Sequence, residues 1–192
     1  MKPPQNIFYA SDRNEWRRWL AAHYEVASEV WFVFPTKASG EPALAYNDAV
    51  EEALCFGWID STARQLDELH QLRRFTPRRK GSPYSRPNIE RLIWLNGQGK
   101  LHPSVREAVL PIISEPYRFP DDIIEALREH PVAWQFYSTL SPSYCRIRIA
   151  YIDAARHRPA EFAKRLAHFI AKCSKRQLII GYGGVDKYYN KQ

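Results

Sequence analysis

The chain is expected to be an α+β protein, with a small mixed or antiparallel sheet and helices in its N-terminal part and only helices in its C-terminal part. Residues 29–35 form a short run that is almost entirely apolar, β-branched or aromatic, which is typical of a central strand. Two further strand patterns, at residues 58–66 and 70–76, are joined around Asp67 and Glu68 as a hairpin. After Ser85 the apolar residues recur only at helical spacing.

Caps and periodicity predict the other elements. Residues 7–10 are expected to form a short strand, and Ser11 is expected to cap the helix that follows. A helix is predicted from Tyr46 to Gly57, because apolar residues recur there at helical spacing and glycine commonly ends a helix. Ser85 is expected to cap the next helix, with Gly97 and Gly99 at its end. Later helices are predicted at residues 105–112, from 121 to a stop at Pro131, and at 134–140, 144–156 and 159–173.

With 192 residues, the chain is expected to form one domain, or one domain with a small appendage. We expect residues 1–116 to form the α+β part and residues 120–176 a helical part packed on it. The tail, residues 177–192, is rich in glycine and tyrosine, lacks a period and is predicted to be loosely held. Its glycine cluster, residues 181–184, is interpreted as part of this flexible tail.

Composition limits the class of protein. The chain is 45% hydrophobic and 26% charged, as expected of a soluble globular protein, and it has no apolar run of membrane-spanning length and no secretory signal. Its three cysteines, Cys55, Cys145 and Cys173, form no C-x-x-C pair, so neither a zinc knuckle nor a disulfide framework is indicated. A cytoplasmic location fits best, since cytosolic thiols stay reduced.

The surplus positive charge is concentrated in one stretch. Between His70 and Ala108 there are nine Lys or Arg residues and two Glu, and nine minus two equals the whole net charge of +7. Residues 69–89 contain no carboxylate. Concentrated charge creates a local potential that favours anionic partners.

Residues 73–91, called here the basic segment, therefore contain the candidate anion site. Guanidinium groups can bind phosphate or carboxylate oxygens, hydroxyl groups can donate hydrogen bonds, and a tyrosine offers a ring face for a base. The alternative is a solvated basic loop whose arginines pair with Glu51, Glu52 or Asp60. The candidate anion-binding residues are Arg73, Arg74, Thr76, Arg78, Arg79, Ser82, Tyr84, Ser85 and Arg86.

Trp58 and Asp60 are candidate supporting residues. Asp60 is expected on the strand beside the basic one, where it is predicted to hold Arg73 or Arg74 in a structural salt bridge. A catalytic role for this carboxylate is the alternative, and Trp58 is expected to belong to the core. The sequence contains no complete catalytic signature and no paired histidine motif. We therefore assign no catalytic residue, no metal ligand and no cofactor.

The last predicted helix has a second, weaker basic face. Lys164, Arg165, Lys172 and Arg176 can share a side opposite its apolar residues. An ordinary solvated face is the preferred interpretation. If both basic regions lay on one side of the molecule, they would suit a nucleic-acid backbone.

Three sequence runs together resemble a known family. They are AVEEALCFGWIDS at residues 49–61, RRFTPRRKGSPYS at residues 73–85 and SYCRIRIAYIDAAR at residues 143–156. In this order they resemble the YdeI/OmpD-associated, or bacteriocin-protection, family over roughly residues 29–173. The resemblance implies a small bacterial cytosolic α+β protein without a settled reaction. The family pattern usually has Trp where Tyr84 stands, and a small hydroxyl residue where Ala45 stands, so this chain lacks a helix cap at Ala45.

Three functions remain open from the sequence. The favoured one is binding of an anionic partner, either a phosphate-containing ligand or a nucleic acid, through the basic segment. The second is an enzyme for a small anionic substrate, in which Arg78 and Arg79 position the substrate and Asp60 or His70 moves a proton. The third is a stress or envelope-protection protein that acts through contacts with a protein partner, as the name of the family suggests.

Overall fold

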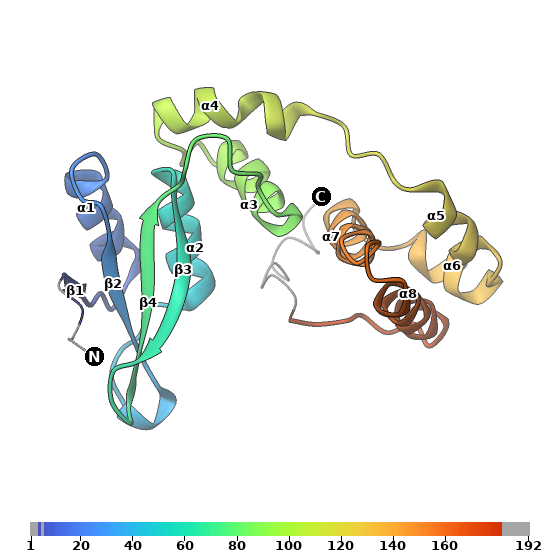
Figure 1. The fold of residues 1–192 in the computed structure, drawn as a ribbon, viewed down its shortest axis with the longest axis horizontal. Helices are drawn as coiled ribbons and strands as arrows, with labels where there is room; N and C mark the ends of the chain where they lie inside the picture. The colour runs from blue at the N-terminus through green and yellow to red at the C-terminus, as the bar shows by residue number, and fades with distance from the viewer. Residues whose placement is uncertain (1–3, 5, 182–192) are drawn as a thin grey trace. The chain divides into compact units, whose positions relative to one another are not determined.

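The structure, a computed structural model, describes residue 4 and residues 6–181, so most of the predicted tail lies outside the described residues. The expected α+β class is confirmed, because the sheet lies in the N-terminal half and the C-terminal part is helical (Figure 1). The chain divides into two compact units, one of residues 1–83 and 95–110, the other of residues 84–94 and 111–192.

The first unit contains a mixed four-stranded sheet in the order β1-β2-β4-β3. The short strand β1 pairs with β2 in parallel. The other two pairs, β2 with β4 and β4 with β3, are antiparallel. Its elements are β1 (Ile7–Phe8), α1 (Arg13–His23), β2 (Val30–Pro35), a 3-10 turn (Lys37–Ser39), α2 (Tyr46–Cys55), β3 (Trp58–Gln65) and β4 (His70–Pro77).

Both α1 and α2 pack on the same face of this sheet. The ring of Trp16 on α1 lies 5.0 Å from that of Phe32 and 5.4 Å from that of Phe75. Tyr46, the first residue of α2, contacts Phe34 of the same strand face. Trp58 is 1% exposed, which confirms its place in the core. Side chains alternate between the two faces of a strand, so these contacts fix the orientation of every residue along β2 and β4.

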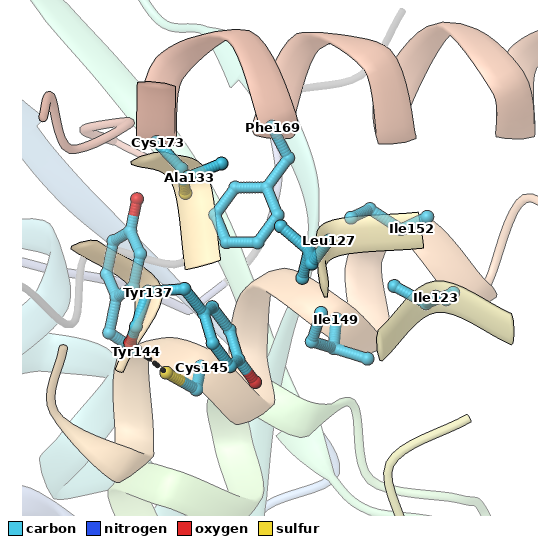
Figure 2. Packing of buried hydrophobic residues seen from close by; sticks show 10 residues of the cluster. All are labelled: Ile123, Leu127, Ala133, Tyr137, Tyr144, Cys145, Ile149, Ile152, Phe169 and Cys173. Atoms are coloured by element: carbon cyan, nitrogen blue, oxygen red, sulfur yellow. Dashed lines mark hydrogen bonds between the residues drawn. The ribbon is translucent and has the colours of Figure 1, made fainter. Parts of the chain in front are cut away.

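The second unit contains most of the helical part. Two helices have residues in both units: α3 (Arg86–Gly97) and α4 (Pro103–Ser114). The others are α5 (Asp121–Arg128), α6 (Pro131–Tyr137), α7 (Pro142–Asp153) and α8 (Pro159–Ser174). Figure 2 shows their common core. Within it, the ring centre of Phe169 on α8 lies 6.2 Å from that of Tyr137 and 6.4 Å from that of Tyr144.

Two predicted helix boundaries were wrong. The cap of α1 is Asp12 rather than Ser11: its carboxylate accepts from the backbone N–H groups of Asn14 and Glu15, while Ser11 donates back to Glu15. Pro131 does not stop a helix but begins α6, because a missing N–H costs nothing in the first turn. In contrast, α2 begins after Ala45 without a side-chain cap, as expected.

Candidate functional site

The strand β4 separates the two adjacent arginines of the candidate site. Phe75 points towards α1, so Arg73, two residues away, lies on the same face, and its guanidinium carbon lies 5.1 Å from the ring centre of Tyr46 on α2. Arg74 and Thr76 lie on the opposite face. The structure therefore does not bring Arg73 and Arg74 to a common point.

Asp60 interacts with Tyr46 rather than with an arginine. Its carboxylate accepts a 2.6 Å hydrogen bond from the Tyr46 hydroxyl, and it forms no ion pair with any residue that the structure describes. The expected salt bridge to Arg73 or Arg74 was therefore wrong. Because Arg73 packs over the Tyr46 ring, Asp60 and Arg73 are connected only through this tyrosine.

Arg74 is neutralised on the second face of the sheet. Its Nε donates to Glu29 at 2.7 Å, and Glu29 also accepts from the indole N–H of Trp31 at 3.2 Å. The guanidinium of Arg64 covers the Trp31 ring at 4.6 Å. Sequence reasoning missed Glu29 and Arg64, because the pairing of β2 with β4 becomes known only from the register of the sheet.

The acids proposed as alternative partners are engaged elsewhere. Arg13 of α1 pairs with Asp48, Glu51 and Glu52 at 2.7–3.0 Å. Glu52 also pairs with Arg17 at 2.8 Å. Burial by itself lowers the pKa of Arg13, but the three carboxylates outweigh it and raise the pKa above its ordinary value. The two buried glutamates, Glu51 and Glu52, therefore balance α1 rather than the basic segment.

The loop of residues 77–83, called here the basic loop, is organised by Arg78. Its guanidinium donates to the backbone carbonyls of Ser82 and Pro83, both at 3.0 Å, and its own N–H donates to the Gly57 carbonyl at 2.9 Å. Gly81 has a φ of +79°, which suits glycine and lets the loop reverse direction.

Arg79 and Lys80 differ from the other cations of the basic segment. Both are exposed, and neither side chain forms an ion pair or hydrogen bond with the part of the chain that the structure describes. The backbone carbonyl of Arg79 accepts from the N–H of Ser82, which closes the turn between them. These two cations are available to an external anion without the loss of an existing contact.

The remaining candidates, Tyr84, Ser85 and Arg86, belong to the second unit. Ser85 precedes α3, and its carbonyl accepts from the N–H of Ile89 at 3.0 Å. Arg86 pairs with Glu90, which is 2% exposed, and packs 5.0 Å from the ring of Tyr117. The charge of Arg86 is thus used within its own unit.

His70 lies at the wrong end of β4 to act at the basic loop. It hydrogen-bonds to Glu41 at 2.9 Å and to Asp67 at 2.8 Å, and these partners raise its pKa. With β4 extended between them, eight residues place His70 roughly 25 Å from Arg78. A proton transfer by His70 to a substrate held by Arg78 is therefore excluded.

The cysteines are free and buried within the described residues. Burial raises the pKa of the thiols of Cys55 and Cys145 to about 11 and that of Cys173 to about 12. No three His, Cys, Asp or Glu side chains in residues 6–181 are grouped so that they would hold a metal ion. No helix in this part of the chain combines the length and apolar character that crossing a membrane requires.

The fold and the site define a class: an α+β protein of two units with an organised basic loop. Residues 8–108 match the family model described as a domain of unknown function, DUF8412, and this match covers more than half of the chain. The chain belongs to this family. Residues 116–176 match the model described as bacteriocin-protection, YdeI or OmpD-associated, which confirms the resemblance seen in the sequence.

The three sequence runs that suggested the resemblance do not all lie within the same family match. The run at residues 143–156 lies within the YdeI/OmpD-associated match, whereas the runs at residues 49–61 and 73–85 lie within the match at residues 8–108. No curated protein and no solved structure matched the chain.

Proposed function

We propose that the protein binds an anionic partner, a phosphate-containing ligand or a nucleic acid, through the basic segment. The observation that carries the proposal is the exposed, unneutralised pair Arg79 and Lys80 in a loop that Arg78 holds in place. Adjacent exposed cations attract a polyanion through its phosphates, independently of its base sequence.

The intramolecular partners of the other arginines limit which cations of the basic segment can bind the anion. Arg74 and Arg86 are balanced by Glu29 and Glu90, and Arg73 packs on a tyrosine ring. Recruiting any of these three would break an existing contact, whereas Arg79 and Lys80 lose only water and side-chain freedom. Within the basic segment, Arg79 and Lys80 are therefore the two cations that can bind an anion without losing an existing contact.

Contacts within the basic loop hold it in place for such a ligand. Arg78 uses its guanidinium on the carbonyls of Ser82 and Pro83, so it positions the loop instead of competing for the ligand. We place this binding in the cytosol, where the three free thiols stay reduced.

Salt dependence of binding tests the proposal. The affinity of a fluorescein-labelled single-stranded RNA of about 20 nucleotides is measured by anisotropy between about 50 and 200 mM salt. Replacement of two phosphate-contacting cations, in Arg79→Gln/Lys80→Gln, is expected to reduce the slope of log K against log salt by about 1.4, since each single-strand phosphate contact contributes about 0.7.

A matched control is available in the same unit. Arg18→Gln/Lys37→Gln removes two exposed cations that also have no side-chain partner among the described residues, and is expected to leave the slope unchanged. Competition with pyrophosphate separates the two ligand classes, because a small phosphate ligand at the same loop displaces the RNA. Absence of binding by both RNA and pyrophosphate, or equal effects of the two double variants, would refute the proposal.

A further inference from the structure

The second unit contains a solvent-open cavity of about 370 Å³ between α7, α8 and the residues that follow α8. This volume lies within the range of pockets for small molecules. Ile152 and Phe169, which belong to the buried core in Figure 2 and are each 1% exposed, lie beneath the cavity, and Ile179 and Ile180 supply its accessible apolar surface. The cavity therefore offers apolar surface that is continuous with the core of the unit.

One wall of the cavity is held in place by backbone hydrogen bonds. The N–H of Ile179 donates to the Tyr144 hydroxyl at 2.8 Å, and the Arg148 guanidinium donates to the Ile179 carbonyl. Arg148 is 3% exposed and lies 5.2 Å from the ring centre of Tyr144. A segment after the end of α8 is thus fixed against α7, which preserves the shape of the cavity.

A second wall is fixed by Arg165. Its guanidinium stacks 3.8 Å from the ring centre of Tyr151, and donates to Glu161 and to the Tyr151 carbonyl, both at 2.7 Å. The Glu161 carboxylate, the only acid among the described residues that line the cavity, is therefore engaged, and its hydrogen bond to Arg165 and the nearby cations lower its pKa. This leaves three cationic side chains, Arg148, Lys164 and Arg165, against one carboxylate.

Lys164 and His168 are the lining groups that remain available. They lie four residues apart on α8, so they share one side of this helix. Both are exposed, and neither side chain forms an ion pair or a hydrogen bond with the residues that the structure describes. An acidic group at this edge meets Lys164 without displacing an existing partner.

We propose that this cavity binds a small organic anion that combines an acidic head group with a flat apolar body, such as an aromatic carboxylate or sulfonate. The head group contacts Lys164 and His168, and the apolar body lies against Ile179 and Ile180, the lining residues with accessible apolar surface. This site uses no residue of the basic loop. It also gives part of the basic face of α8 a role, where the sequence favoured an ordinary solvated surface.

The probe 8-anilinonaphthalene-1-sulfonate tests the site, because it has this chemistry and becomes fluorescent in apolar surroundings. Saturable binding to the folded full chain is expected, and Lys164→Gln is expected to raise its Kd about fivefold, the effect of about 1 kcal/mol from one partly exposed charge contact. Lys175→Gln removes one cation just beyond α8 and outside the cavity, and is expected to leave Kd unchanged.

Two comparisons complete the test. The neutral probe N-phenyl-1-naphthylamine is expected to bind more weakly than the sulfonate and to be insensitive to Lys164→Gln. Arg79→Gln/Lys80→Gln is expected to leave sulfonate binding unchanged, so failure of this site and failure of the basic loop are distinguishable. No saturable sulfonate binding, equal Kd values for the Lys164 and Lys175 variants, or equal affinity of the neutral probe would overturn the proposal.

Discussion

Single side chains show why the number of charges in a sequence differs from the charge available for binding. Glu90 is a buried example of such a partner. It is 2% exposed, and it pairs with Arg86 of its own helix and with Arg146 of α7. Burial by itself raises the pKa of Glu90, but the hydrogen bonds and charges of Arg146 and Arg86 outweigh burial and hold the pKa below 4.5. One carboxylate thus pairs with cations from two distant parts of the sequence.

Removal of this carboxylate is expected to be costly. In Glu90→Gln, Arg86 and Arg146 lose their common ionic partner in a largely buried setting, so the free energy of unfolding is expected to fall by about 3 kcal/mol. Hydrogen exchange of the backbone amides of α7 that follow Pro142 measures the loss within the second unit. The control Asp122→Asn breaks the exposed pair with Arg156 and is expected to change stability by less than about 1 kcal/mol.

The pH dependence of this effect has a defined sign. Because the folded-state pKa of Glu90 lies below its unfolded value, its stabilisation is present above about pH 4.5 and is lost as the pH falls through the folded-state value. The difference in stability between the wild type and Glu90→Gln is therefore expected to shrink below that pH. A difference that stays constant down to pH 3 or so would show that the ionised carboxylate is not responsible.

At the scale of elements, Gly57 determines how α2 leads into the sheet. It follows the end of α2 with a φ of +73°, and its carbonyl accepts from the N–H of Arg78 at 2.9 Å. A Cβ at this position would lie 3.4 Å from Cγ2 of Val105. The end of one helix and the start of the basic loop are therefore joined at a residue whose conformation favours glycine.

Two glycine substitutions in the first unit are expected to act in opposite directions. Gly57→Ala places a side chain at positive φ and is expected to lower the free energy of unfolding by about 1 to 2 kcal/mol. Gly97→Ala, in the last turn of α3 where nothing lies within 4 Å of the added Cβ, is expected to raise it by about 0.5 kcal/mol. Urea unfolding followed by circular dichroism measures both, and destabilisation of equal size in the two variants would contradict this account.

Most elements could be predicted from local sequence because their signals are local. The hairpin of β3 and β4 and the helices α2 and α3 depend on period and terminal glycines, and they form where expected. The predictions failed where two neighbouring residues compete, as Ser11 and Asp12 do for the cap of α1. They also failed at Pro131. A proline lacks the N–H that a helix interior needs, but the first turn of a helix does not need it, so a proline can indicate either the end or the start of a helix.

At the scale of the whole molecule, the candidate site could be predicted only in part. The sequence located the concentration of charge, but not which acids neutralise it, because Glu29 lies 45 residues from Arg74 and the sheet brings them together. Strand alternation separated Arg73 from Arg74, although they are adjacent in the sequence. The cavity of the second unit gave no sequence signal beyond the basic face of α8, because its apolar lining comes from two helices and the residues after them.

A titration of the ¹⁵N-labelled protein with pyrophosphate, followed by amide chemical shifts, tests whether Arg79 and Lys80 are the cations of the basic segment that bind an anion. We therefore expect saturable shifts at the amides of residues 78–82, and none in the Arg79→Gln/Lys80→Gln variant. Saturable shifts centred instead on Arg73, Arg74 or Arg86, or no shifts in the basic loop at all, would contradict it.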